Sequence, residues 1–186
     1  LLTSSITPIQ QYSYTTGKNA IDSALIIDAM DILYTNTVDG FCIVSSDSDF
    51  TRLAARLRES GMYVIGMGEK KTPPPFISAC NKFKFLEVLA VPQSTELAPV
   101  KDVSIQNNLE TLKRSILTLT EEFSDEDGWA FLGDIGNQLQ RRNPDFDVRN
   151  YGFTKLTPFI RSLKKFEIEM RPSNANSNNC FIRNKK

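Results

Sequence analysis

Asp47 and Asp49 are the residues of this sequence whose types and spacing most clearly suggest chemistry. They follow residues 41–44, an apolar run typical of a buried strand in a parallel sheet, and an amphipathic helix is predicted from Phe50 onward. Ligands of open α/β sheets bind at the carboxyl ends of the strands. Two carboxylates in such a turn repel each other unless a cation offsets them, and Mg²⁺ prefers oxygen ligands of this kind. The pair therefore predicts a site for a divalent cation.

The same turn has a simpler interpretation that involves no ligand. Ser46 or Ser48 is able to cap the following helix, and acidic residues near a helix N-terminus are stabilised by its positive end. The turn alone leaves both interpretations open, so the choice depends on whether another carboxylate reaches the same place.

Asp22 is the further candidate for this cluster. It lies in the first turn of a helix predicted over residues 20–33. At 100° per residue, Asp28 and Asp31 point well away from Asp22, so those two are interpreted as structural or solvated residues. We expect this helix to contact the core through Ile21, Ala24, Leu25, Ile32 and Leu33.

The composition restricts the class of protein. The chain has 186 residues, enough for one large or two small domains, and its 22 basic residues balance its 22 acidic ones. It contains no histidine, which excludes histidine-based catalysis and disfavours a zinc site. No apolar stretch approaches the roughly 18 residues of a transmembrane helix, so no membrane span is expected.

The cysteines and the first residue bear on the setting of the protein. The sequence contains three cysteines, an odd number, and they lie far apart at Cys42, Cys80 and Cys180. This pattern favours a reducing, cytoplasmic location. Cys42 lies within an apolar strand and is expected to be a small core residue. No signal peptide is visible, and the chain starts at Leu1 rather than Met, which leaves open that the natural N-terminus is missing.

The first half of the sequence alternates predicted strands with predicted helices. This order indicates parallel strands joined by crossover helices. Gly61 is expected to end the second helix as its C-cap. Strands are predicted at residues 6–14, 41–44, 63–67 and 83–88, and helices at 20–33, 50–59 and 76–80.

The second half has a different pattern. Residues 91–102, with two prolines and many polar residues, are predicted to form a linker. Three helical segments and a β-hairpin follow, which indicates a winged helix-turn-helix arrangement. The helical segments are predicted at residues 105–123, 132–142 and 147–163, with Pro158 in a first helical turn, and the strands at 166–171 and 180–184.

Three segments of the first half, GKNAID at residues 17–22, LIIDAMD at 25–31 and SSDSDF at 45–50, resemble the NYN domain. This is the LabA-like branch of the PIN-like nuclease superfamily, and the resemblance covers about residues 1–89. It implies a metal-dependent ribonuclease whose acidic cluster binds Mg²⁺ or Mn²⁺. By motif match, the cluster consists of Asp22, Asp47 and Asp49, with Asn19 and Ser46 as polar neighbours.

The resemblance also creates an expectation about what precedes Leu1. The family begins with a strand that bears an aspartate near its carboxyl end, followed by a helix, whereas only five residues precede Ile6 here. A parallel sheet that lacks a strand exposes unpaired backbone groups. We therefore expect a first β-α unit to be missing from this sequence, and the chain without it to cleave weakly or not at all.

Four segments of the second half, residues 127–132, 144–147, 150–156 and 166–168, resemble the OST-HTH, or LOTUS, domain over about residues 109–183. The resemblance implies binding to RNA, or in some animal members to helicases. From residue 139 to 186 there are eleven Lys or Arg against four Asp or Glu, as phosphate binding requires. Alternatively, the basic side chains of the last helix only solvate its surface, and Trp129 is more typical of a core residue than of a base-stacking one.

These observations predict an α/β parallel-sheet domain at residues 1–90, a linker at 91–104 and a small α+β winged helix-turn-helix domain at 105–186. The predicted function is RNA hydrolysis by a cytoplasmic, metal-dependent endoribonuclease of PIN-like type. The alternatives are a non-catalytic adaptor that binds RNA or protein, and a small-molecule enzyme with an apolar pocket beside Asp47. The residues predicted to contact RNA are Lys18, Lys70, Lys71, Arg141, Arg142, Tyr151, Lys155, Arg161, Lys164 and Lys165.

Overall fold

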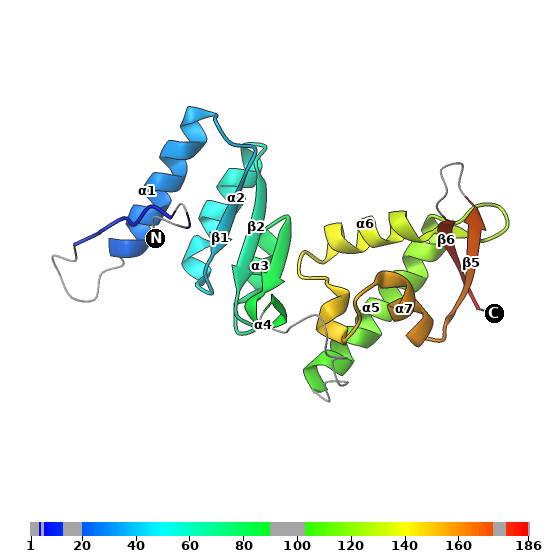
Figure 1. The fold of residues 1–186 in the computed structure, drawn as a ribbon. Coiled ribbons are helices and arrows are strands. Elements are labelled where there is room, and N and C mark those ends of the chain that lie inside the picture. The colour runs from blue at the N-terminus through cyan, green and yellow to red at the C-terminus, as the bar shows by residue number, and fades with distance from the viewer. Residues whose placement is uncertain (1–3, 5, 13–19, 90–102, 173–177, 186) are drawn as a thin grey trace.

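The computed structural model describes residues 4, 6–12, 20–89, 103–172 and 178–185, and these form two bodies joined along the chain (Figure 1). The first holds a parallel sheet with helices, and the second holds helices with an antiparallel sheet. The predicted fold class is therefore confirmed for both halves. Within the described part of the chain, no helix is both long and apolar enough to cross a bilayer.

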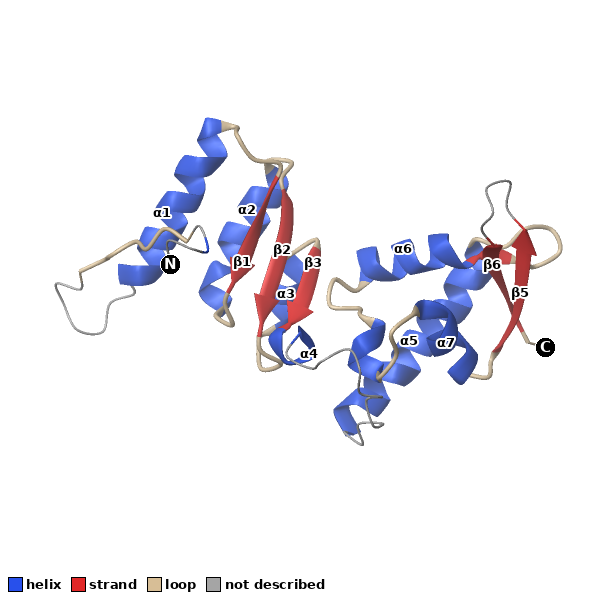
Figure 2. Cartoon of the chain, in the orientation of Figure 1, coloured by secondary structure: helices blue, strands red, loops and turns tan. Residues whose placement is uncertain are grey.

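The sheet of the first body contains three parallel strands, β1 (Gly40–Val44), β2 (Tyr63–Gly68) and β3 (Lys82–Phe85), in the order β1-β2-β3. They lie side by side in Figure 2. Gly40 pairs with Tyr63, and Ile65 pairs with Lys82, so all three strands end at the same edge of the sheet. Residues that follow these strands are thereby brought together.

Two helices, α2 (Thr51–Glu59) and α3 (Pro74–Ala79), pack on one face of this sheet. The C-cap of α2 is Ser60 rather than the predicted Gly61, which follows it with φ of +85°, the left-handed conformation common just after a helix. The core between helices and sheet is closed by Phe76 and Phe83, whose rings meet edge to face with centroids 5.9 Å apart.

Leu33 of the helix α1 (Ala20–Thr35) packs against the core as predicted, but most of the predicted contact face does not. Ile21 is 73% exposed, and Leu25 and Ile32 are exposed as well. Apolar residues occur on every side of this helix, so its sequence does not select one face, and packing decides. The side chains that contact the core are Ile26, Ala29, Met30 and Leu33.

Two predicted strands differ in the structure. Residues 6–12 are irregular and exposed, because no described strand lies beside them to pair with; residues 13 and 14 of that prediction lie outside the described residues. The strand predicted at residues 83–88 ends at Phe85, where the chain turns into the short helix α4 (Leu86–Leu89). The first prediction was wrong over residues 6–12, and the second was wrong only beyond Phe85.

Cys42 was also predicted wrongly. Side chains of β1 alternate between the two faces of the sheet, so Ile43 is buried against α2 and α3 while Cys42 and Val44 are exposed on the other face. Cys80, by contrast, is buried, and burial raises the pKa of its thiol to about 11.

The second body contains α5 (Val103–Glu122), α6 (Leu132–Arg142), the 3₁₀-helix η3 (Val148–Tyr151) and α7 (Leu156–Ser162). Pro158 falls in the first turn of α7 as predicted, where its missing N–H costs little. Residues 91–102 of the linker predicted at 91–104 lie outside the described residues, and residues 103 and 104 belong to α5 instead. The core side chains of this body include Leu112, Ile116, Leu119, Ile135, Leu139, Phe159 and Ile160.

An antiparallel sheet completes this body in the order β4-β6-β5. The hairpin strands β5 (Phe166–Pro172) and β6 (Asn178–Asn184) were predicted within two residues at each end. The two-residue strand β4 (Ala130–Phe131) was not predicted, since it is too short for a periodic pattern and forms only because Ala130 pairs with Ile182.

The two cores share no buried residue, so we expect the bodies to unfold separately. Leu57→Ala and Ile116→Ala should each lower the free energy of unfolding of their own body by about 2–5 kcal/mol. Trp129, the sole tryptophan, reports on the second body. In urea, Leu57→Ala should shift the midpoint seen by circular dichroism and not that of tryptophan fluorescence, whereas Ile116→Ala should shift the fluorescence midpoint. Equal shifts of both signals in both variants would show one cooperative unit.

Candidate metal centre

Asp22, Asp47 and Asp49 meet at the carboxyl edge of the parallel sheet. Each offers one carboxylate oxygen, and these oxygens all lie within 4.8 Å of one another. Asp22 is half-buried, and Asp47 and Asp49 are exposed. The predicted convergence of the three aspartates is therefore confirmed, although a long stretch of sequence separates Asp22 from the other two.

The turn after β1 holds Asp47 and Asp49 through a chain of backbone hydrogen bonds. The N–H of Ser45 donates to the carbonyl oxygen of Met67 (2.8 Å), which extends the strand pairing past the end of β1. The N–H of Asp47 then donates to Ser45 Oγ (3.1 Å), and the N–H of Asp49 donates to Asp47 Oδ1 (3.0 Å). Asp47 thus caps the 3₁₀-helix η2 (Ser48–Phe50), the role that the ligand-free interpretation gave to Ser46 or Ser48.

Ser46 ties this turn to the neighbouring strand. Its Oγ accepts a hydrogen bond from the backbone N–H of Glu69 (2.9 Å), just beyond the end of β2. Gly68 permits this close approach, because a Cβ atom there would lie 2.5 Å from the carbonyl oxygen of Ser45. Ser46 therefore joins the turn that carries Asp47 and Asp49 to the chain after β2. Its role as a polar neighbour of a metal site stays a prediction.

The donor set fits a hard divalent cation. All three candidate ligands are carboxylate oxygens, the type that suits Mg²⁺ and Mn²⁺. Asp22 enters from the first turn of α1, whereas Asp31 on the same helix is exposed outside the cluster. A cation at this point would also offset the mutual repulsion of three carboxylates.

The basic residues predicted near this edge have less clear roles. Lys18, like the predicted polar neighbour Asn19, lies outside the described residues. Lys71 pairs with Glu69 (Nζ···Oε2 2.6 Å), and the hydrogen bond with that carboxylate raises the pKa of the lysine. Lys70 is exposed, and its backbone N–H donates to Glu87. A role of Lys70 and Lys71 in RNA binding stays a prediction.

The basic residues predicted in the second body fall into two groups. Arg141 and Arg142 are exposed at the C-terminal end of α6. Arg161, Lys164 and Lys165 are exposed at or just after the end of α7, whereas Lys155 lies at the opposite end of that helix.

The two aromatic residues singled out in the sequence are partly buried. Tyr151 packs against Phe159, with ring centroids 5.2 Å apart, and burial raises the pKa of its hydroxyl to about 12. This environment matches a core role for Tyr151. Trp129 is half-buried beneath Arg171 and Arg183, whose guanidinium carbons lie 5.5 and 4.7 Å from its ring centroid.

One residue of interest has no signal in the sequence. Arg58, in the last turn of α2, lines the same cleft as Arg141 and Arg142 although they belong to different bodies. On sequence alone, Arg58 is one more polar residue on the exposed face of an amphipathic helix, and only the meeting of the two bodies distinguishes it.

Comparison with known proteins agrees with the two-part architecture. Residues 1–87 match the family described as the NYN domain, and residues 107–177 match the OST-HTH/LOTUS domain. A solution NMR structure of an uncharacterized protein of Nitrosomonas europaea is similar, with 27% identity over 52% of this chain and 87% of that chain and a TM-score of 0.38. No curated protein matches the chain.

Cation binding at the aspartate cluster should stabilise the first body. Mn²⁺ at about 100 times its dissociation constant is expected to raise the free energy of unfolding by about 2.7 kcal/mol. Asp47→Asn should largely remove this gain while keeping the oxygen that accepts from Asp49, so the turn remains capped. Thermal unfolding with Mn²⁺ and with EDTA measures the effect, and Asp31→Asn is the matched control on α1. An equal Mn²⁺ response in both variants would contradict the site.

Proposed function

The chain carries an NYN domain at residues 1–87 followed by an OST-HTH/LOTUS domain at 107–177, and from this premise we propose that it is a metal-dependent endoribonuclease. An NYN domain is a nuclease-type domain, and a LOTUS domain is an RNA-binding domain. The observation that carries the proposal is the meeting of three carboxylates within 4.8 Å at the end of the parallel sheet. The proposed substrate is an RNA phosphodiester, cut within the strand.

In this proposal, Asp22, Asp47 and Asp49 hold Mg²⁺ or Mn²⁺. The cation supplies Lewis-acid chemistry, which activates water and stabilises the negative charge that develops on phosphate oxygens. The chain's own contribution is to fix the ligands before the substrate arrives. The hydrogen bonds of the turn after β1 hold Asp47 and Asp49, and the packing of α1 brings Asp22 to them.

The second domain is proposed to retain the RNA. Its basic side chains at the ends of α6 and α7 are exposed, as contacts with phosphates require. We further propose that the protein is a LabA-like member of the PIN-like nucleases, that it acts in the cytoplasm, and that its two functional units span residues 1–90 and 105–186.

Loss of one cluster carboxylate should remove activity without loss of RNA binding. Asp47→Asn is expected to reduce Mn²⁺-dependent cleavage of a labelled RNA by about 100-fold or more, because metal-assisted steps contribute several kcal/mol. The measurement is gel analysis of cleavage products, performed with the longest natural form of the protein.

The control for this experiment is Asp31→Asn, which should cleave like the wild type. A wild-type protein that binds RNA tightly yet shows no Mn²⁺-dependent cleavage would favour the adaptor alternative, in which the nuclease-type domain is degenerate. Equal cleavage by Asp47→Asn and the wild type would remove Asp47 from the mechanism.

Charge reversal around α7 should weaken RNA binding by the second domain. Lys155→Glu, Lys164→Glu and Lys165→Glu together are expected to lower affinity for all RNA sequences and to reduce the steepness of its salt dependence. Fluorescence anisotropy with labelled RNA at two salt concentrations measures both. Affinity that is indifferent to salt and to these substitutions would favour a protein-docking role for the LOTUS domain.

A further inference from the structure

The two domains meet at the outer edge of β3. The backbone N–H of Phe83 donates to the carbonyl oxygen of Pro144 (2.8 Å), and β3 is the last strand of its sheet. Next to this contact, Lys84 forms an ion pair with Asp147, whose carboxylate also accepts from Arg149 (Nη2···Oδ2 2.8 Å). These contacts place the C-terminal end of α6 beside the sheet.

The ion group at this junction persists near neutral pH. The side chain of Asp147 is only 10% exposed. Burial raises the pKa of its carboxyl, but hydrogen bonds from Arg149 and Lys84 outweigh that effect and hold the pKa well below its ordinary value. A depressed carboxyl pKa contributes stability at every pH above the unfolded value of about 3.9 and loses it only as the pH falls through the folded value. Asp147 is therefore ionised near neutral pH, the form that pairs with Lys84.

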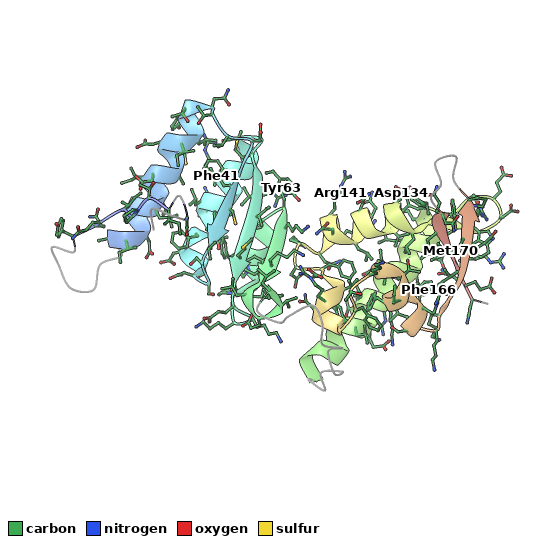
Figure 3. All side chains as sticks on the ribbon, viewed as in Figure 1. Phe41, Tyr63, Asp134, Arg141, Phe166 and Met170 are labelled. Carbon is green, nitrogen blue, oxygen red and sulfur yellow. The ribbon has the colours of Figure 1, made fainter. Side chains whose placement is uncertain are left out.

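A cleft of about 760 Å³ opens beside the junction, and both domains line it. The first domain contributes Arg58 and Tyr63, and the second contributes Arg141 and Arg142. Figure 3 shows Tyr63 and Arg141 on facing sides of the space between the domains. The lining contains these three arginines and no carboxylate, so its charge is strongly positive in a chain of zero net charge.

Two of the three arginines that line the cleft have no carboxylate partner among the described residues, which leaves their charge available to an anion. Arg58 Nη1 donates to three carbonyl oxygens at and after the end of α3, at 3.2 to 3.5 Å, which fixes its guanidinium in the wall. Arg142 donates to Glu122 (2.8 Å) and is partly neutralised. Arg141 is exposed and forms no ion pair with any residue that the structure describes. Arg58 and Arg141 thus carry the uncompensated charge.

Neutral polar groups and one aromatic ring complete the lining. Asn137 and Gln140 project from α6 into the same cleft and supply amide donors and acceptors. Tyr63 is 50% exposed. Guanidinium groups bind phosphate oxygens with paired hydrogen bonds, and exposed aromatic rings stack on unpaired bases. This combination recognises a phosphate-bearing strand rather than an apolar ligand.

We propose that the interdomain cleft binds the phosphate backbone of a single RNA strand through Arg58 and Arg141. The inference rests on the proposed function, which supplies RNA as the ligand. Tyr63 begins β2, whereas Asp47 follows the end of β1, so the cleft and the aspartate cluster lie at opposite ends of the sheet. The six residues of β2 span roughly 20 Å. The cleft therefore holds a part of the RNA that is distant from the bond to be cut.

The test measures binding of a labelled single-stranded oligoribonucleotide in EDTA, where the aspartate cluster holds no cation. Arg58→Ala and Arg141→Ala should each weaken binding by about 10-fold and lower the slope of log affinity against log salt by about 0.7. Arg56→Ala is the matched control, since Arg56 is exposed on the same helix and pairs with Glu59, outside the cleft. It should bind within about twofold of the wild type.

Folding and cleavage are followed in the same variants. Arg58→Ala removes hydrogen bonds to α3 and is a less useful variant if it unfolds. In that case Arg141→Ala alone tests RNA binding by the cleft, since Arg141 makes no such hydrogen bonds among the described residues. With Mn²⁺, Arg56→Ala should cleave RNA like the wild type, because Arg56 lies outside the cleft. A long substrate at low concentration should be cleaved more slowly by Arg141→Ala.

Asp147→Asn distinguishes specific RNA binding in the cleft from general electrostatic attraction of RNA to the protein. The substitution removes a negative charge, so general attraction predicts tighter RNA binding. The cleft predicts weaker binding, by several-fold, because the ion pair of Lys84 with Asp147, one of the contacts that join the domains, is lost. Tighter binding by Asp147→Asn would overturn a site shared by both domains.

The remaining outcomes distinguish the two proposals. RNA binding and salt slopes that are the same in Arg58→Ala, Arg141→Ala and Arg56→Ala would overturn the cleft and leave the nuclease proposal standing. A wild-type protein that neither binds nor cleaves RNA would overturn both. Cleft variants that lose binding to an acidic peptide, but not to RNA, would assign the cleft to a protein partner and overturn the inference.

Discussion

Repulsion among three carboxylates is the constraint on which the arrangement of the first domain depends. At about 4 Å, two unit charges repel by about 1 kcal/mol in bulk water, and by more where solvent is partly excluded. Asp22, Asp47 and Asp49 are nevertheless held within 4.8 Å. Two hydrogen bonds join the turn after β1 to the neighbouring strand: the N–H of Ser45 donates to the carbonyl oxygen of Met67, and Ser46 Oγ accepts from the N–H of Glu69. These hydrogen bonds oppose the repulsion, which a bound cation would offset.

The parts of the fold that could be predicted are those set by local pattern. The bounds of α6 were predicted to the residue, because Leu132, Ile135 and Leu139 repeat at helical spacing and Pro144 stops the helix soon after. The position of Asp47 and Asp49 was predictable because both follow a strand, and ligands bind at the carboxyl ends of parallel strands. Asp22 was placed with them by motif match, since residues 6–12 before it form no strand. Their role as metal ligands is implied by the resemblance to the NYN domain, and their positions in the fold do not test it.

The features that could not be predicted depend on contacts with segments that are distant in the sequence. β4 forms only where β6 lies beside it, and the buried face of α1 is chosen by the core rather than by its own periodicity. Cys42 sits in an apolar strand, yet the face of the sheet that it occupies stays exposed. Likewise, no described strand pairs with the outer edge of β1. The cleft at Arg58 belongs to the same class, since it exists only where two domains meet.

The zero net charge of the chain conceals two regions of opposite sign that make different demands on an RNA strand. A phosphate approaching the three aspartates is repelled until a divalent cation is present, so contact at that end of the sheet requires the cation. A phosphate approaching Arg58 and Arg141 is attracted without any cation, and the attraction weakens as salt rises. RNA is therefore expected to dock first at the arginines and to engage the aspartates only when the cation is bound. The two regions lie at opposite ends of β2. The length of the RNA therefore determines how strongly binding at the arginines raises the local concentration of RNA at the aspartates.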